Sequence, residues 1–250
     1  MTILALYSNK GGVGKTASTV NLSYLAAQSG YKTLVCDLDP QSSTTYYFRV
    51  KPKLERSPKK FAKGDKSVEA SIKGTDYENL DLLPADFTHR NLDVTFKQMK
   101  HSKERLRKIL DPLKEEYDII FLDCPPTINL IAENIFNAVD ALLVPLIPST
   151  LPARAYKQLL IFLEKTGYNL NQVYPFFSMV DRHNKTHRET GLEVFKTYDK
   201  VLKSPIPYLL QIEQMGGYRE PVPAYAPDSF AAQAYKNLWV EIQQKILTAK

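Results

Sequence analysis

The chain has 250 residues, of which 44% are hydrophobic and 24% are charged, so it is long and apolar enough to bury a full core. These proportions exclude a disordered chain and a collagen-like repeat, and two cysteines are too few for a small protein held together by disulfides. Lysine and arginine number 33 against 27 aspartate and glutamate residues, which gives a net charge of +6. We expect one domain over residues 1–250.

The apolar residues form short runs that alternate with longer segments of helical period. Strands are predicted at 2–7, 33–36, 80–83, 118–123, 141–144 and 173–179, and helices at 15–29, 87–110, 127–137, 152–166, 187–200 and 228–247. Strands that are almost entirely apolar and alternate with helices predict an α/β fold, in which a mostly parallel, twisted sheet carries helices on both faces. Ligands of such sheets bind beyond the carboxyl ends of the strands, so the functional residues are expected there.

The positive charge is concentrated in two stretches. Residues 49–73 contain nine basic and three acidic side chains, and residues 97–108 contain six basic side chains and one acidic. A basic face that binds a polyanion and an ordinary solvated surface explain these clusters equally well. Residues 50–66, rich in proline, lysine and serine, are the best candidate for a flexible basic insert.

A glycine-rich segment, Lys-Gly-Gly-Val-Gly-Lys-Thr at residues 10–16, lies between the first strand and the first helix. Glycine lets backbone N–H groups approach a phosphate closely because it has no Cβ, and the helix points its positive end at the same place. Lys15 would then pair with the β- and γ-phosphates, and the Thr16 hydroxyl would bind Mg²⁺. The alternative is a glycine turn that binds nothing, but the strand, loop and helix together favour a phosphate-binding loop.

Acidic residues follow two of the predicted strands. Asp37 and Asp39 come after the second strand, and their spacing of two points both side chains to the same side of the chain. Asp123 ends the apolar run 118–123. Carboxylates at this sheet edge suit the positioning of a water molecule and contacts to Mg²⁺. A solvated strand end is the alternative for each of them when it is considered alone.

The phosphate loop departs from the strict pattern in one informative way. The first glycine of that pattern would fall at position 9, which is Asn9 here, and Lys10 begins the glycine run instead. The segment resembles the deviant Walker A box, x-K-G-G-x-G-K-[ST], of the ParA/MinD family of ATPases. This resemblance implies a P-loop NTPase-like fold, ATP and Mg²⁺ as cofactors, and a Lys10 that reaches across a dimer interface to ATP in the partner subunit. A loop cation that only raises the local potential is the other interpretation of Lys10.

The resemblance also implies roles for the acidic residues. Residues 37–41 look like the family's D-x-D-P-Q switch, in which the second aspartate, here Asp39, orients the attacking water, while Asp37 is a supporting ligand or hydrogen-bond acceptor. Residues 118–123 look like its Walker B strand, so Asp123 is expected to hold Mg²⁺. The expected catalytic residues are Lys10, Lys15 and Asp39, and the expected metal-binding residues are Thr16, Asp39 and Asp123. The expected nucleotide contacts are Lys10, Gly11, Gly12, Val13, Gly14, Lys15, Thr16, Ala17, Met179 and Pro207.

Similarity to the ParA-type branch extends over nearly the whole chain. Residues 177–182 look like that branch's strand and nucleotide-base loop. Tyr208 stands where the family often has arginine, and Tyr-Arg-Glu at 218–220 replaces its usual Gly-Lys before a proline, so DNA-contacting arginines cannot be transferred to this region. The DNA-binding residues expected instead lie beside the base loop: Arg182, Lys185 and Arg188.

Membrane and cluster-binding relatives of the family are less similar to this chain. No apolar run approaches the ~20 residues of a membrane-spanning helix, and we expect a soluble, cytoplasmic, nucleoid-associated protein. The apolar stripe of the last helix is better explained as a core face than as a membrane face. That stripe comprises Phe230, Tyr235, Leu238, Trp239, Ile242 and Ile246. Cys36 and Cys124 do not resemble the ligand pattern of iron–sulfur reductases.

The leading functional hypothesis is therefore a Mg²⁺-dependent ATPase that forms a homodimer when ATP is bound. Such a protein would bind non-specific DNA and position a cargo, namely a plasmid, a chromosome region or a protein organelle. An adaptor protein would stimulate its slow hydrolysis. The alternatives are a membrane-associated spatial regulator of the MinD type and a metabolic P-loop ligase.

Overall fold

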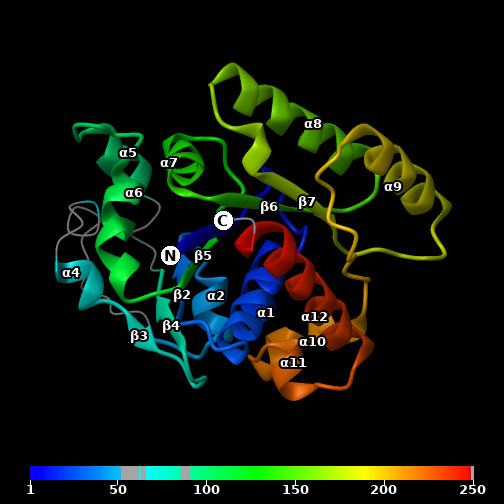
Figure 1. Ribbon diagram of the computed structural model, residues 1–250, viewed down its shortest axis with the longest axis horizontal. Coiled ribbons are helices and arrows are strands. Elements are labelled where there is room, and N and C mark those ends of the chain that lie inside the picture. The colour runs from blue at the N-terminus through cyan, green and yellow to red at the C-terminus, as the bar shows by residue number, and fades with distance from the viewer. Residues whose placement is uncertain (52–61, 63–65, 86–90, 249–250) are drawn as a thin grey trace.

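The computed structural model describes residues 1–51, 62, 66–85 and 91–248, and in them a seven-stranded sheet forms the centre of the molecule (Figure 1). The strand order is β3-β4-β2-β5-β1-β6-β7, and every neighbouring pair is parallel except β3 with β4 at one edge. The strands are β1 (Thr2–Leu6), β2 (Thr33–Asp37), β3 (Lys73–Gly74), β4 (Leu80–Leu83), β5 (Ile119–Asp123), β6 (Ala141–Leu146) and β7 (Val173–Phe177). The predicted α/β class with a mostly parallel sheet is confirmed.

Helices cover both faces of this sheet, because successive strand residues point to opposite sides. Ile3 and Ala5 of β1 lie in one core with the helices α5 (Leu92–Lys97), α6 (Arg105–Leu110), α7 (Leu130–Ala138), α8 (Thr150–Lys165) and α9 (Lys185–Thr197). Leu4 and Leu6 lie in the other core, which contains residues of α1 (Lys15–Gln28), α10 (Leu210–Tyr218), α11 (Val222–Tyr225) and α12 (Phe230–Ile242). The short α2 (Ser43–Tyr47) and α4 (Lys66–Glu69) and the turns η2 (Asp111–Glu115), η3 (Leu170–Gln172) and η4 (Gln243–Leu247) complete the described elements.

The helix predicted over 87–110 is two short helices, α5 and α6, separated by residues 98–104, while residues 87–90 lie outside the described part. Asn134 of α7 explains the interruption. Its buried side-chain amide donates to the carbonyls of Ser102 and Leu130 at 2.7 and 2.8 Å, and its Oδ1 accepts from the N–H of Leu106 at 3.1 Å. The turn thereby finds the partners that a continuous helix would have supplied itself.

The proposed basic insert at 50–66 lies almost entirely outside the described residues, since 52–61 and 63–65 are not described. Five α-helices and strands within the described part were not predicted, namely α2, α4, β3, α10 and α11. Two of these, α10 and α11, are held by a buried polar side chain of α1, since the Asn21 amide donates to the Sδ of Met215 in α10 at 3.2 Å. The Asn21 side chain of α1 accepts a hydrogen bond from the N–H of Val222 at 2.7 Å and donates to the Ala17 carbonyl at 2.7 Å.

The last helix buries its apolar stripe, with one exception. Tyr235, Leu238, Trp239, Ile242 and Ile246 are all buried in the core that contains α1. Phe230, at the first turn of α12, is 54% exposed, so the prediction that it faces the core is wrong. Among the described residues, no helix is long and apolar enough to cross a membrane.

The carboxyl ends of three adjacent strands meet at one point of the sheet edge. Leu6 of β1 and Asp37 of β2 both pair in register with Asp123, the last residue of β5. Tyr7 directly follows β1. Its ring packs edge-on against that of Phe136 of α7, with 4.9 Å between the ring centres, and its hydroxyl donates to the Thr127 carbonyl. This packing fixes the start of the loop between β1 and α1, and the loop lies over the two aspartates.

Candidate functional site

The loop between β1 and α1 has a backbone that only glycine accommodates easily. Gly12 and Gly14 have φ values of 70° and 86°, in the left-handed region that disfavours side chains with a Cβ. At Gly14 there is a second reason, because a Cβ there would lie 2.8 Å from the Oγ of Ser178, a buried residue that follows β7. Glycine at position 14 therefore lets the loop after β7 approach the glycine-rich loop.

Helix α1 begins at Lys15 with an N-terminal end that suits an anion. Among the described residues, no side chain caps its first turn, and the first turn holds no acidic residue. The free backbone N–H groups and the positive end of the helix dipole therefore face the glycine-rich loop. Together they form a binding site for a phosphate group.

The two lysines of the loop lie in different environments. Lys15 is only 7% exposed, and its ammonium donates to the carbonyl of Lys10 across the loop at 3.1 Å. Burial lowers the pKa of Lys15, and the carboxylates of Asp123 and Asp39 oppose that shift. Lys10 itself is exposed at the outer side of the loop. The inner lysine is thus placed against the acidic sheet edge, and the outer one is accessible to another molecule.

The Asp123 carboxylate connects three parts of the chain. It is fully buried and accepts hydrogen bonds from the hydroxyls of Thr16 at 2.9 Å and Thr19 at 3.4 Å, both in α1. The hydroxyl of Thr44, at the start of α2, also donates to it at 2.7 Å. Burial raises the pKa of Asp123, while these hydrogen bonds from Thr44 and Thr16 lower it. The carboxylate therefore joins the glycine-rich loop to the segment that follows β2.

The Asp37 carboxylate is buried and hydrogen-bonded within the protein rather than open to a ligand. One of its oxygens accepts from both the N–H and the hydroxyl of Thr45, at 2.9 and 2.7 Å. Its other oxygen accepts from the N–H of Asp39 at 3.2 Å. Burial, and next to it the charge of Asp123, raises the pKa of Asp37. Of the two roles expected for Asp37, the geometry matches the hydrogen-bond acceptor.

Asp39 lies on the loop between β2 and α2 and is half-buried. One carboxylate oxygen accepts from the N–H of Gln41 at 2.9 Å, which closes a local turn. The negative charge of Asp39 interacts with the site, since it contributes to raising the pKa of both Asp123 and Lys15. Asp37 and Asp39 therefore differ in burial and in partners, although their spacing alone would place them side by side.

The residues at this sheet edge could provide part of the coordination of a hard divalent cation, and a bound phosphate would provide the rest. Thr16 and Asp123 are in direct contact, and both offer oxygen, the donor that Mg²⁺ prefers. Asp39 lies within electrostatic range of them. The described residues contain no group of three or more histidine, cysteine, aspartate or glutamate side chains that would hold a metal alone. Mg²⁺ usually keeps several waters and binds through one or two carboxylates plus substrate phosphates, which matches this set.

Four residues of the site were not identified from the sequence: Thr19, Thr44, Thr45 and Ser178. Thr44 and Thr45 belong to the run Ser-Ser-Thr-Thr at 42–45, directly after the Asp-Leu-Asp-Pro-Gln segment. Hydroxyl residues so close to two acidic strand ends were a usable signal. Ser178 had no such signal, because its contact with Gly14 depends on the packing of the loop after β7.

Met179 and Pro207, the expected base contacts, lie on neighbouring segments beyond the end of β7. The N–H of Val180 donates to the Ile206 carbonyl and the N–H of Tyr208 donates to the Val180 carbonyl, each at 3.0 Å. Met179 has a left-handed backbone, with φ of 55°. A cavity of about 400 Å³ lies beside these segments, and Val180, Pro207 and Phe230 are among its lining residues. Since Ser178 contacts Gly14, this region adjoins the glycine-rich loop.

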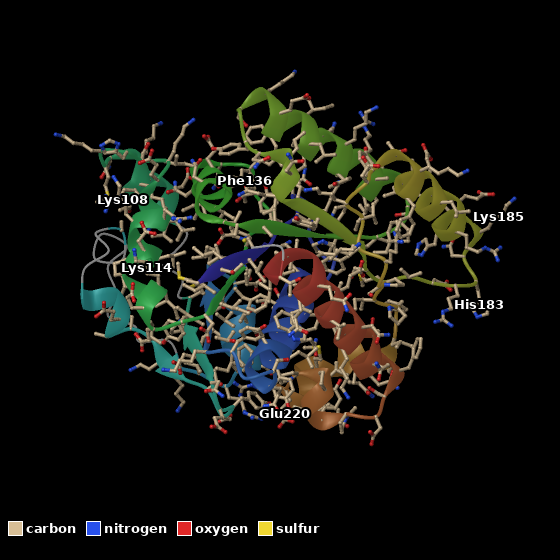
Figure 2. All side chains as sticks on the ribbon, in the orientation of Figure 1. Lys108, Lys114, Phe136, His183, Lys185 and Glu220 are labelled. Carbon is tan, nitrogen blue, oxygen red and sulfur yellow. The ribbon has the colours of Figure 1, made fainter. Side chains whose placement is uncertain are left out.

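The three expected DNA contacts are exposed at the start of α9. Arg182 lies in the turn before the helix, with its guanidinium 5.0 Å above the centre of the exposed Phe230 ring. Lys185 begins α9 and lies 3.6 Å from Glu189, and Arg188 follows one turn later. Figure 2 shows Lys185 and the neighbouring His183 at the outer edge of the molecule. These residues form one surface, which is separate from the aspartates at the sheet edge.

The chain is similar to known proteins over most of its length. A family model described as an AAA domain matches residues 1–174. The sporulation initiation inhibitor protein Soj of Bacillus subtilis is 30% identical over 246 residues, which cover 96% of this chain and 97% of Soj.

Solved structures share the fold over nearly the whole chain. A putative plasmid partition protein from Borrelia burgdorferi bound to AMPPNP has a TM-score of 0.83 and 25% identity, with 98% of this chain and 99% of that chain covered. Cobyrinic acid a,c-diamide synthase from Mycobacterium smegmatis, bound to an ATP analog and magnesium, has a TM-score of 0.81 and 25% identity, with 98% and 96% covered. The chain therefore belongs to the ParA/MinD family of deviant Walker A ATPases, in its ParA-type branch.

Proposed function

We propose that this chain is a Mg²⁺-dependent ATPase that dimerises when it binds ATP, binds DNA without sequence preference and positions a cargo. The cargo is a plasmid, a chromosome region or a protein organelle. An adaptor protein stimulates the slow hydrolysis, and the dimer resides on the nucleoid in the cytoplasm. One observation carries the proposal. Thr16, at the end of the glycine-rich loop, and Thr44, in the segment after Asp39, both donate to the Asp123 carboxylate.

ATP binding follows from the charges and donors of the loop. The free N–H groups at the start of α1 bind phosphate oxygens, and the buried ammonium of Lys15 neutralises part of their charge. Thr16 and Asp123 would hold Mg²⁺, which would offset the charge that develops on the phosphate oxygens. Met179, in the loop beyond β7, and Pro207, in the neighbouring segment before α10, contact the base. Because Lys15 lies in a buried position, its electrostatic attraction to phosphate is weakly screened.

Hydrolysis depends on the segment from Asp39 to Thr44. The Asp39 carboxylate orients the attacking water, and Thr44 fixes the distance of this segment from the phosphates through its bond to Asp123. The turn that Asp39 makes with Gln41 restricts the directions its carboxylate can take. Positioning of this kind, with electrostatic stabilisation, accounts for most of the catalysis in phosphoryl transfer.

The exposed position of Lys10 supports a role between subunits. Its carbonyl accepts from Lys15, whereas its side chain belongs to the exposed outer surface of the loop. A second subunit that docks over the loop would bring its own phosphates within reach of this cation. Lys10 then links ATP binding to dimerisation and contributes to catalysis in the opposite site.

The metabolic ligase has one structural observation in its favour. The synthase from Mycobacterium smegmatis shares 25% identity and a TM-score of 0.81 with this chain. The partition ATPase remains the better proposal because a relative named as a partition protein has a TM-score of 0.83, and Soj is 30% identical. A ligase would hydrolyse ATP only with its carboxylate substrate, so ATP hydrolysis by the chain alone separates the two.

The Asp39→Ala variant should bind ATP normally but hydrolyse it about 10²-fold more slowly, because it loses the group that orients the water. Isothermal titration measures the affinity and phosphate release measures the turnover, both with Mg²⁺. The control is Asp199→Ala, which removes an exposed carboxylate after α9, away from the site, and should match the wild type. Wild-type turnover of the Asp39 variant would contradict this role.

The Lys10→Ala variant should keep its affinity for ATP within about twofold but lose the dimer that ATP induces, because its cation contacts the partner's phosphates. Sedimentation velocity with a slowly hydrolysed ATP analogue reports the dimer. The control is Lys114→Ala, which removes an exposed lysine from η2 (Figure 2). If the Lys10 variant dimerises as well as this control, the role between subunits is wrong.

Binding of the ATP-bound dimer to two unrelated DNA duplexes should depend steeply on salt, with log K falling by about 0.9 per phosphate neutralised. Reversing Arg182, Lys185 and Arg188 to glutamate should flatten this slope and leave ATP affinity unchanged. The matched variant reverses Lys97, Lys100 and Lys108 of the second basic cluster, which changes the net charge equally. A flatter slope only in the matched variant would transfer DNA binding to α5 and α6.

A further inference from the structure

Helix α2 has five residues, and its two ends are held by different parts of the molecule. A helix of this length is not stable alone, because the cost of forming the first turn is not recovered. Its first turn is attached to the sheet edge by Thr44 on Asp123 and Thr45 on Asp37. The position of the helix must therefore depend also on what holds its last turn.

Arg219 holds the last turn of α2. Its Nε donates to the Tyr46 carbonyl at 3.0 Å, and its guanidinium lies 4.3 Å from the centre of the Tyr46 ring. The Tyr46 hydroxyl donates in return to the carbonyl of Gly216 in α10, at 3.3 Å. Arg219 directly follows α10 with φ of 56°, a left-handed backbone that ends the helix and leads the chain back toward α2.

Arg49, two residues beyond α2, makes a second connection. Its Nε lies 2.8 Å from the carboxylate of Asp76, between β3 and β4, and one terminal nitrogen lies 2.7 Å from Glu220. Arg219 and Glu220 are neighbours in sequence, so both connections end on the short segment between α10 and α11. Figure 2 labels Glu220 at the lower edge of the molecule. We call Tyr46, Arg49, Arg219 and Glu220 the α2 clasp.

The clasp uses residues at which this chain departs from the usual pattern of its family. The segment 218–220 reads Tyr-Arg-Glu where Gly-Lys is expected, and its arginine contacts Tyr46 of α2 while its glutamate contacts Arg49, two residues beyond the helix. Exposed ion pairs contribute little to global stability one at a time. The three contacts at Tyr46 and the ion pairs of Arg49 act differently, because they decide where α2 lies rather than whether the domain folds.

We infer that Arg219 and Arg49 are positioning residues for ATP hydrolysis, and this inference rests on the ATPase function proposed above. Arg219 fixes the last turn of α2 through Tyr46, and Arg49 fixes the chain two residues beyond it. The helix carries that constraint to Thr44 and so to Asp123. The loop that carries Asp39 runs directly into the same helix. Loss of the clasp widens the range of positions open to Asp39, whereas the phosphate loop, which belongs to β1 and α1, is unaffected.

The test compares Arg219→Ala with Lys200→Ala in the full-length protein. Lys200 is a matched control, because it also donates to a backbone carbonyl, that of Asn171, and lies 5.1 Å over a tyrosine ring, that of Tyr174. These contacts lie beside β7 and do not involve α2. Turnover and the KM for ATP are measured for both variants, and amide hydrogen exchange is followed in residues 43–48 without nucleotide.

Arg219→Ala should lower kcat roughly three- to tenfold with KM within about twofold, and should speed exchange in residues 43–48. Lys200→Ala should change neither. Glu220→Gln removes only the charge that pairs with Arg49. It should therefore lower kcat and speed exchange in residues 43–48 less than Arg219→Ala does. Unchanged kcat in Arg219→Ala, or an equal loss in Lys200→Ala, would overturn the inference.

The exchange measurement separates this inference from the proposed function. If the wild type does not hydrolyse ATP, the ATPase proposal fails and the positioning role fails with it. If the wild type hydrolyses ATP and Arg219→Ala speeds exchange in α2 without lowering kcat, the ATPase proposal stands. In that case the clasp is only a structural contact and the positioning role is refuted.

Discussion

A buried carboxylate surrounded by hydroxyl groups is the interaction on which the rest of this site depends. Asp123 ends the central strand β5, where no solvent reaches it, and Thr16, Thr19 and Thr44 donate to it. Burial of a carboxylate is costly unless it is hydrogen-bonded or paired with a cation. The three hydroxyls compensate part of that cost, and they come from the two segments that phosphate binding must bring together. The carboxylate therefore couples the glycine-rich loop to the loop that carries Asp39.

A nucleotide with Mg²⁺ would neutralise the buried charges at this sheet edge. Asp37 and Asp123 end adjacent strands in register, and each has a raised pKa because it is buried. The Lys15 ammonium is buried as well, and its pKa is lowered. A divalent cation offsets the carboxylates and a phosphate group offsets the lysine, so the ligand satisfies both sets of charges at once. The clasp around α2 adds a connection to α10, and Lys10 is exposed beside this edge.

The sequence allowed the sheet and the inner site to be predicted because both depend on local patterns. The strand ends, the glycine loop, Lys15, Thr16 and Asp123 each carry a signal within a few residues. The helix over 87–110 was predicted as continuous because its interruption depends on Asn134, which is distant in sequence. For the same reason Ser178 and α11 were missed, since each is fixed by a contact with a remote residue. The spacing of two predicted only that Asp37 and Asp39 point to the same side of the chain, whereas the structure shows that they differ in burial.

The most direct measurement of the central claim is the Mg²⁺ dependence of ATP binding in the wild type and in Asp123→Asn. Asparagine keeps the size of the side chain and can still bond the three hydroxyls, but it has no charge to hold the cation. Isothermal titration with ATP should show that Mg²⁺ raises the affinity of the wild type at least about tenfold, a difference of roughly 1.4 kcal/mol. In Asp123→Asn, Mg²⁺ should leave the affinity nearly unchanged. An equal Mg²⁺ effect in both proteins would show that the buried carboxylate does not organise the site.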